Sequence, residues 1–392
     1  MKRTICSITG TRADYGLMRP VFSAIAQKQS LHLDLIVTGM HLLTEFKTSL
    51  EVIEADRYGD LHRCSMTLAE DSGKAMAQSF GLAVFSMAEI LDRLKPDIML
   101  LQGDRGEMLA GAVCAAHMNI PIVHMSGGDY SGSIDDPIRN AISKFAHIHL
   151  TTCSQSTDRL LAMGEAAARI LEVGEPGLDA IRTMQFVPPD RLAREFRLDL
   201  GKPIVLATQH PVTTEADRSA DQIRETLTAL EELGMQTIFT YPNSDAGGRE
   251  MIQVLEGYRE KGFIRIVPNL GSGKYLSLLK IASVLVGNSS SGILEAPSFK
   301  VPVVNVGTRQ QGRLRAVNIL DVGYDRNGIK EMIRFALQDG PFKAKLADCR
   351  NPYGDGHTAE KTVKILTELK LTHALIAKWL PSDEAFLPGA VT

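Results

Sequence analysis

The chain alternates short apolar, β-branched runs with longer amphipathic stretches, and this alternation limits the folds that it can adopt. In the first half, strands are expected at 3–8, 31–37, 97–102, 121–125 and 147–152, with helices over 17–28, 74–94, 106–118 and 134–146. Five more strand-like runs follow at 203–208, 235–241, 263–268, 283–287 and 301–306. Continuous apolar strands separated by helix-length segments indicate parallel sheets covered on both faces. We therefore expect two Rossmann-like, doubly wound α/β domains.

The domain boundary is expected within 174–191, "GEPGLDAIRTMQFVPPDR", where glycine and proline interrupt the pattern. At 392 residues the chain exceeds what one hydrophobic core usually organises. We place an N-terminal domain at 1–182 and a C-terminal domain at 183–368. A closing helix and tail, 369–392, are expected to pack back on the N-terminal domain.

Charge and composition exclude several classes of protein. The 43 Lys and Arg against 46 Asp and Glu give a net charge of −3, which argues against general nucleic-acid or anionic-membrane binding. No stretch approaches the roughly 18 apolar residues of a membrane span, and the N-terminus does not read as a signal peptide. Five widely separated cysteines without a CxxC pair fit a reducing compartment, so a cytoplasmic protein is expected.

Polar residues follow the first-domain strands at their carboxyl ends, where such folds bind ligands. In "TGTRADYG", Arg12 lies beside the start of a helix and suits a phosphate, although an ordinary turn with a surface arginine is equally open. No GxGxxG is present, so no dinucleotide cofactor is expected. In "LLQGDRGEML", Asp104 is either a general acid or base with a raised pKa, or the N-cap of the next helix.

The segment "HMSGGDYSGSIDDPIR", 124–139, is rich in glycine and aspartate. Its glycines allow unusual backbone angles, and it contains three aspartates. Gly132 is expected to let the backbone approach a ligand closely. One of Asp135 and Asp136 caps the following helix, and the other is free for proton transfer with Asp129. His124 with Asp129 is a poor match to a metal site, so no metal is expected.

The second domain carries the strongest motif, "VGNSSSGILEAPSF", in which three serines follow a strand. Hydroxyls and free backbone N–H groups there suit an anion, and a glutamate one turn later suits ribose hydroxyls; a serine-rich capping turn is the alternative. Further polar side chains follow neighbouring strands, and a structural role for the histidine stays open. The candidates are His210, Asn243, Ser289, Ser290, Ser291, Glu295 and Arg309.

Taken together and in order from residue 4 to about 316, these motifs resemble the UDP-N-acetylglucosamine 2-epimerases. More narrowly they resemble the hydrolysing branch, which makes N-acetylmannosamine or its 2,4-diacetamido-trideoxy analogue for sialic-acid-like sugars. "LQGDR", "YPNSDAGG" and "VGTRQQGR" belong to the same set. The resemblance implies a glycosyltransferase-B-like fold, with a cleft between two Rossmann-type domains and a C-terminal helix that returns to the first.

The resemblance also implies a reaction without a cofactor: UDP is eliminated to leave a glycal, water adds, and the free manno-configured sugar departs. It implies that Asp104 and Asp135 transfer protons, that Arg12, His210, Ser290 and Ser291 hold the diphosphate, and that Asn243 and Glu295 hold uridine and ribose. Arg105, Ser289 and Arg309 are further candidates for binding UDP. Many relatives carry a catalytic glutamate where this chain has Ser126, and Asp129 is the candidate replacement.

The sequence motifs leave other functions open. A non-hydrolysing epimerase, a UDP-sugar glycosyltransferase of the same fold or a nucleotide-sugar sensor would share these motifs. The expected partner is a small nucleotide sugar, not a nucleic acid or a membrane. A homodimer or homotetramer is expected, with 74–94 as a candidate contact helix unless that segment belongs to the domain core.

Overall fold

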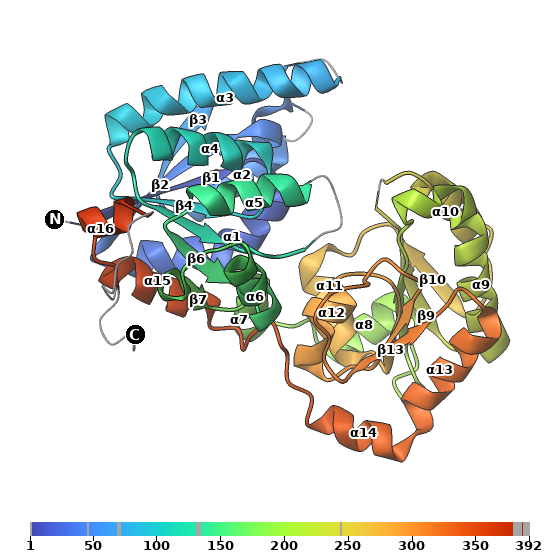
Figure 1. The fold of residues 1–392 in the computed structure, drawn as a ribbon. Coiled ribbons are helices and arrows are strands. Elements are labelled where there is room, and N and C mark those ends of the chain that lie inside the picture. Colours follow the sequence, from blue (N-terminus) through green and yellow to red (C-terminus); the bar gives the residue numbers. More distant parts are fainter. Residues whose placement is uncertain are drawn as a thin grey trace. The chain divides into compact units, whose positions relative to one another are not determined.

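The computed structural model describes residues 2–44, 47–68, 72–130, 135–243, 245–378 and 386. The chain divides into two compact units, Met1–Arg182 with Tyr353–Thr392, and Thr183–Pro352 (Figure 1). Each unit is an α/β domain built on a parallel sheet, as the alternating pattern predicts. Among the described residues, none of the helices combines the length and apolar character needed to cross a bilayer.

The first unit has a seven-stranded sheet with the order β3-β2-β1-β4-β5-β6-β7. Its strands are β1 (Arg3–Thr9), β2 (Leu31–Thr38), β3 (Asp60–Cys64), β4 (Ile98–Gln102), β5 (Ile122–Met125), β6 (Ile148–Thr151) and β7 (Ile170–Glu172). Its helices are α1 (Arg12–Gln27), α2 (Lys47–Asp56), α3 (Gly73–Leu94), α4 (Gly106–His117), α5 (Asp135–Phe145), α6 (Ser154–Ala162), α7 (Gly177–Thr183), α15 (Thr358–Glu368) and α16 (His373–Ile376). Short 3₁₀ turns lie at Gly39–Leu42 and Ala167–Arg169.

Two separate apolar clusters cover the two faces of this sheet. On one face, side chains of α1 and α15, including Phe22 and Leu366, pack on the strands. On the other face, α3, α4 and α5 contribute Met87, Met108 and Ile142 to a second cluster. Burial on both faces is the reason why the central strands are continuously apolar rather than alternating.

The second unit has a six-stranded sheet with the order β10-β9-β8-β11-β12-β13. Its strands are β8 (Val205–Thr208), β9 (Thr237–Thr240), β10 (Ile264–Val267), β11 (Val284–Gly287), β12 (Val303–Val306) and β13 (Ile319–Val322). Its helices are α8 (Pro189–Phe196), α9 (Ser219–Leu233), α10 (Gly248–Glu256), α11 (Gly271–Ile281), α12 (Ser291–Leu294), α13 (Arg326–Gln338) and α14 (Gly340–Ala347), with 3₁₀ turns at Thr213–Arg218 and Ala296–Phe299. Both sheets contain the strand order of the Rossmann fold.

The structure revises the expected domain limit at residue 368, because the chain returns to the first unit at Tyr353. The carboxylate of Asp179 accepts hydrogen bonds from the backbone N–H groups of Thr358 (2.9 Å) and Ala359 (2.7 Å), so a first-unit side chain caps α15. Arg3 donates to the carbonyls of Leu366 and Thr367 at the other end of that helix. Of the expected tail, residues 379–385 and 387–392 lie outside the described residues.

Three strands were missed by the sequence pattern, β3, β7 and β13. All three lie at an edge of their sheet, where one side of the strand has no neighbour. The sequence of β3, "DLHRC", is largely polar because an edge strand is partly exposed to water. A search for apolar runs therefore finds the central strands and the edge strand β10, but it overlooks the other three edge strands.

Candidate active site

Each sheet has one place where the strand order reverses, between β1 and β4 in the first unit and between β8 and β11 in the second. Ligands of doubly wound proteins bind outside the carboxyl ends of strands at this switch point. Arg12 follows β1 and Asp104 follows β4, while His210 follows β8 and the three serines follow β11. Most of the predicted residues therefore lie at or beside a switch point of their own unit.

Asp104 forms an ion pair with Arg139 of α5, and both side chains are largely buried. Arg139 also donates from Nη1 to the backbone carbonyl of Ser126 at 3.0 Å. The guanidinium thus ties the ends of β4 and β5 to one helix. The expectation that Asp104 caps α4 is wrong, since Arg105 occupies the N-cap position.

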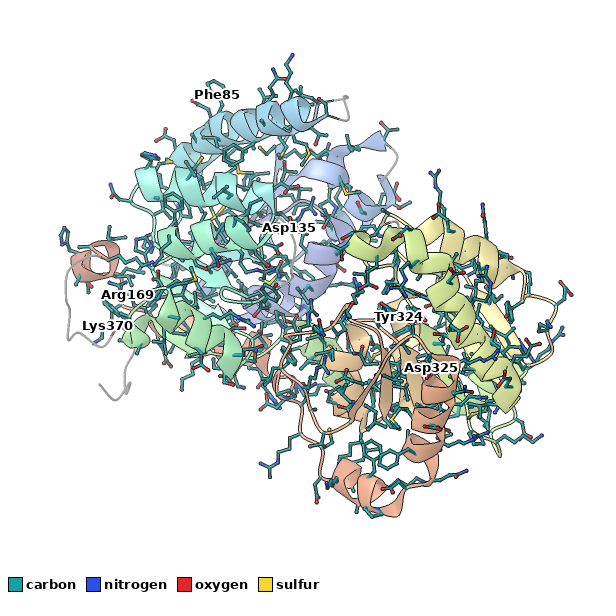
Figure 2. All side chains as sticks on the ribbon, turned by 45° about the vertical axis from the view of Figure 1, so that its right-hand side comes forward. Phe85, Asp135, Arg169, Tyr324, Asp325 and Lys370 are labelled. Carbon is teal, nitrogen blue, oxygen red and sulfur yellow. The ribbon has the colours of Figure 1, made fainter. Side chains whose placement is uncertain are left out.

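Burial raises the pKa of Asp104 above its ordinary value, and the positive charge of Arg139 opposes this shift. The nearby carboxylates of Asp135 and Asp136 raise the pKa further, because two negative charges close together disfavour ionisation. Asp135, labelled in Figure 2, and Asp136 lie in the first turn of α5, so neither occupies the expected N-cap position. A carboxyl group with a raised pKa beside a second acid is suited to accept and return a proton.

Asp129 is held at the end of β5 by two hydroxyl groups. Its Oδ1 accepts hydrogen bonds from Thr152 Oγ1 at 2.6 Å and Ser156 Oγ at 2.5 Å. Gly128, the preceding residue, has φ +77°, and a Cβ there would lie 2.2 Å from the carbonyl oxygen of Ser156. Only glycine allows the chain to pass this close to α6, which fixes the direction of the Asp129 side chain.

Ser126 is 3% exposed and has a left-handed backbone, φ +62°. Its hydroxyl has no hydrogen-bond partner among the described residues. Arg12 and Arg105 are exposed at the starts of α1 and α4. Gly132, expected near a ligand, lies outside the described residues, as do its neighbours 131, 133 and 134.

His124 supports the backbone of this region. Its Nε2 lies 2.8 Å from the carbonyl oxygen of Gly103, and its Nδ1 lies 3.1 Å from Ser143 Oγ. Complete burial lowers the pKa of His124 to about 3, so the ring is neutral. Its Nε2–H group can therefore donate a hydrogen bond to the carbonyl oxygen of Gly103 and hold the turn that presents Asp104.

In the second unit, Nδ1 of His210 accepts a hydrogen bond from the backbone N–H of Asn243 at 2.9 Å. Burial lowers the pKa of His210 to about 4, and the charge of Arg309 acts in the same direction. The ring is thus neutral near pH 7, with its proton on Nε2. His210 is prepared to donate a hydrogen bond to an anion.

Asn288, which the sequence reasoning missed, connects three loops at this edge. Its Oδ1 accepts from the backbone N–H of His210 at 2.6 Å, and its Nδ2 donates to the carbonyl of the same residue at 2.9 Å. Its own carbonyl accepts from Arg309 Nη1 at 3.2 Å and from Gln310 Nε2 at 2.8 Å. In the sequence, the asparagine before the three serines of "GNSSSG" was the signal from which Asn288 could have been predicted as a site residue.

The serine-rich turn begins where β11 passes very close to β8. Gly287 has φ +123°, and a Cβ there would lie 2.0 Å from the carbonyl oxygen of Thr208. Ser289 and Ser290, which follow Gly287 and Asn288, are half-buried. Ser291 is buried and is the first residue of α12. Burial raises the pKa of Glu295, although the adjacent Ser291 hydroxyl opposes the shift.

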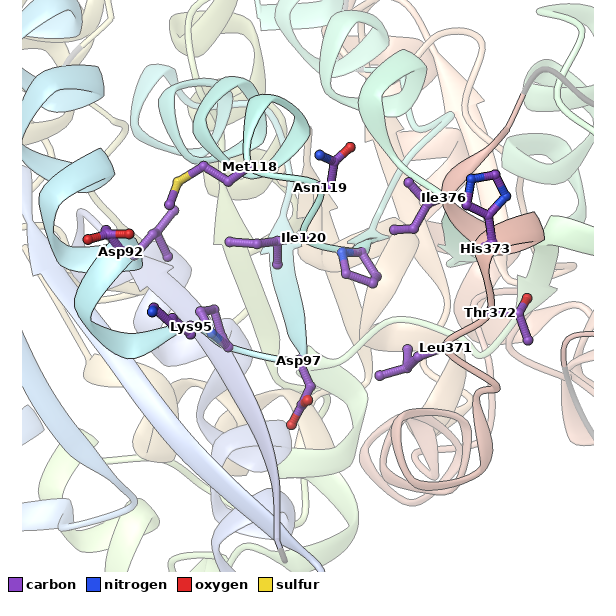
Figure 3. A pocket seen from close by; sticks show the side chains of 13 residues that line it. Asp92, Lys95, Asp97, Met118, Asn119, Ile120, Leu371, Thr372, His373 and Ile376 are labelled. Carbon is purple, nitrogen blue, oxygen red and sulfur yellow. The ribbon is translucent and has the colours of Figure 1, made fainter.

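A cavity of about 580 Å³ lies elsewhere in the first unit (Figure 3). It is lined by the segments before β4 and β5, with Asp97 and Ile120, and by Leu371 and His373 of the C-terminal segment. These are the amino ends of the strands, at the opposite edge from Asp104. None of the predicted site residues lines this cavity.

Two doubly wound α/β units in one chain are the architecture of the glycosyltransferase-B-like class of protein. Residues 23–367 match the sequence family described as UDP-N-acetylglucosamine 2-epimerase. The chain belongs to this family.

Individual relatives agree with this assignment. The chain is 38% identical over 378 residues to the hydrolysing UDP-N,N'-diacetylbacillosamine 2-epimerase of Legionella pneumophila, covering 96% of this chain and 99% of the relative. It is 36% identical over 344 residues to a UDP-N-acetylglucosamine 2-epimerase of Neisseria meningitidis, covering 88% and 90%. A Neisseria meningitidis UDP-GlcNAc 2-epimerase structure shares the fold, with a TM-score of 0.77 at 16% identity and coverage of 93% and 99%.

Proposed function

We propose that this protein is a hydrolysing UDP-sugar 2-epimerase, which converts a UDP-2-acetamido sugar and water into UDP and the free manno-configured sugar. The observation that carries the proposal is the carboxyl group of Asp104, with its raised pKa, paired to Arg139 and next to Asp135. The near full-length similarity to a hydrolysing diacetylbacillosamine epimerase supports a 2,4-diacetamido-2,4,6-trideoxy sugar as the substrate. UDP-N-acetylglucosamine is the second candidate.

The reaction is demanding because the hydrogen on sugar C2 has no adjacent carbonyl group to acidify it. Departure of UDP from C1 must build positive charge on the ring as the C2 proton leaves. Stabilising the charge on the leaving diphosphate is therefore the largest contribution to lowering the barrier. Neutral hydrogen-bond donors that are already in position provide it without rearrangement of the site during the reaction. In this proposal the Nε2–H group of His210, the hydroxyls of Ser289, Ser290 and Ser291, and the charge of Arg309 fulfil that task.

The proton transfers fall to carboxylates of the first unit in this mechanism. A carboxylate takes the C2 proton while the C1–O bond to UDP breaks, which leaves a 2-acetamidoglycal. Water then adds its hydroxyl to C1 and passes its remaining proton to solvent, while a carboxylic acid returns a proton to C2 from the opposite face. Both carboxyl groups then regain their starting states by exchanging protons with solvent. We assign these roles to Asp104 and Asp135, with Asp129 as the replacement for the glutamate that relatives carry at Ser126.

The remaining predicted residues bind the nucleotide in this proposal. Asn243 presents a side-chain Oδ1 that has no hydrogen-bond partner among the described residues, and Glu295 presents such an oxygen, Oε2. Unsatisfied acceptors of this kind are suited to the N–H of uracil and the hydroxyls of ribose. Arg12 and Arg105, both exposed, would add positive charge for the diphosphate.

NMR in D₂O tests the function directly. Each UDP-sugar is incubated with the protein, and UDP, the free sugar and the C2 position are followed. The proposal expects UDP and a free manno sugar carrying one deuterium at C2. A UDP-manno sugar without release would indicate a non-hydrolysing epimerase, and release only with an acceptor would indicate a glycosyltransferase. Tight binding without turnover would indicate a sensor.

We also propose a cytoplasmic homo-oligomer that supplies free manno sugars for sialic-acid-like products. A polysialic acid biosynthesis protein of Escherichia coli, 28% identical over 369 residues, supports the product class. The five cysteines are free and buried, which fits a reducing compartment. Leu82 and Phe85 are exposed on adjacent turns of α3 and offer an apolar contact for a second copy. Phe85 is labelled in Figure 2.

A further inference from the structure

A group of histidine and aspartate side chains lies on β2 and β3 that the proposed reaction does not use. The two strands carry mirrored pairs, His32 with Asp34 and Asp60 with His62. Residues two apart on a strand point to the same face. The parallel register places Asp34 directly opposite Asp60, so all four side chains lie on one face of this edge pair.

The distances among these groups match those between the ligands of a tetrahedral metal. His32 Nε2 lies 3.2 Å from Asp60 Oδ2 and 3.7 Å from Asp34 Oδ2. One ligand atom from each of the three residues lies within 4.8 Å of the others. Zinc bonds to nitrogen and oxygen of about 2.0–2.2 Å put tetrahedral ligands roughly 3.3–3.5 Å apart. The observed separations bracket this value, so the side chains need little movement.

The charges at this position are also compatible with a bound cation. Two carboxylates stand directly opposite each other, an arrangement that is unfavourable between neighbouring strands. Arg63, the basic residue next to His62, projects to the other face of β3 and pairs with Glu54 at 2.7 Å. A divalent ion would neutralise the charge of both carboxylates.

His62 completes the arrangement as a supporting partner. Its Nε2 lies 2.7 Å from Asp34 Oδ1, the oxygen that does not face His32. Carboxylate ligands of metals are usually oriented by such a hydrogen bond on their second oxygen. Asp34 is 5% exposed and is held firmly, whereas the Asp60 side chain is 73% exposed and leaves room for a water ligand.

We propose that His32, Asp34 and Asp60 form a zinc site that links the edge strand β3 to β2. Imidazole and carboxylate ligands with an open fourth position suit Zn²⁺. The site lies toward the amino ends of the strands. Asp34 lies four positions before the end of β2 at Thr38, or about 13 Å at the rise of a strand. The bound ion would therefore stabilise the first unit and take no part in proton transfer.

Calorimetric titration of the full chain tests the site. The protein is freed of metal with a chelator, dialysed and titrated with zinc chloride near neutral pH. We expect one equivalent to bind and the melting midpoint to rise by roughly 5 °C at a hundredfold excess over Kd. The double variant His32→Gln with Asp60→Asn should bind at least tenfold more weakly. His62→Gln should lose about tenfold through the lost support of Asp34.

The control is His117→Gln, which removes an exposed histidine at the end of α4 and should bind zinc as the wild type does. Both altered residues of the double variant are at least partly exposed, so its metal-free melting midpoint should stay within roughly 2 °C of the wild type. Equal zinc affinity in wild type and double variant, or no binding by the wild type, would overturn the proposal. The epimerase assay without zinc is a separate readout, because neither residue belongs to the proposed catalytic set.

Discussion

The most direct test of the proposed chemistry is Asp104→Asn, which removes the charge and the ability to exchange a proton but keeps the shape of the side chain. An Asn oxygen can still accept from Arg139, so one charge-assisted hydrogen bond becomes a weaker one. The difference between the two kinds of bond is about 1 kcal/mol. Arg139 also keeps its bond to the carbonyl of Ser126. We expect the melting midpoint to fall by only roughly 2–4 °C.

The effect on turnover should be far larger than the effect on folding. Loss of a general acid or base typically slows a reaction by about 10²–10⁴-fold, equivalent to about 2.7–5.4 kcal/mol of activation free energy. UDP affinity should stay within several-fold, because the UDP-binding groups proposed for the second unit are untouched. Kinetics by UDP release, calorimetry with UDP and thermal melts give the three quantities. Asp92→Asn, an exposed change on α3, is the matched control.

Two outcomes would refute this reasoning. Wild-type turnover in Asp104→Asn would remove Asp104 from the proton transfers. A loss of UDP binding as large as the loss of turnover would mean that the residue binds the nucleotide instead. A reduced turnover that followed the thermal unfolding curve would show only a structural role, and the small stability change expected above makes that outcome distinguishable.

Three further predictions concern stability and assembly. The pKa of His210 falls from 6.5 to about 4 on folding, so the unfolded chain takes up this proton first and stability should decrease as pH drops from 6.5 towards 4; melting midpoints of His210→Gln over that range should fall less steeply, and equal slopes would contradict the shift. Gly287→Ala should destabilise by at least about 1–3 kcal/mol in chemical denaturation, because its φ of +123° and the carbonyl of Thr208 exclude a Cβ, whereas Gly323→Ala, where a Cβ meets open space, should not. Phe85→Asp should lower the oligomer mass in light scattering. Met76→Asp should leave it unchanged, because Met76 is equally exposed but lies two and a half turns earlier, on the opposite side of α3. A mass unaffected by Phe85→Asp would exclude this contact.

Much of the strand-end chemistry could be read from the sequence, because each motif directly follows an apolar run. Asp104 and His210 needed only the rule that doubly wound folds bind ligands at the carboxyl ends of strands. The sequence next to a helix start predicted N-cap residues less reliably, because it does not show which residue a side chain contacts in the folded chain. Asp104 looked like the N-cap of α4, but its partner is Arg139, 35 residues further along the chain.

Boundaries and supporting residues were harder to predict for a related reason. The segment from Tyr353 reads as a continuation of the second unit because it follows it in the chain. Its place in the first unit depends on Asp179 and Arg3, whose contacts with α15 span more than 170 residues. The role of Asn288 likewise depends on its hydrogen bonds to His210, which lies in the loop after another strand, β8.

By itself the sequence determined the two parallel sheets, their order along the chain and the motifs at the strand ends, because periodicity and burial are local properties of the chain. Tertiary structure alone decided which distant side chains meet. His32 and Asp60 lie 28 positions apart, and no spacing rule joins them. Only the register of β2 against β3 brings them to 3.2 Å, because the pairing of strands is set by the packing of the whole sheet and not by neighbouring residues.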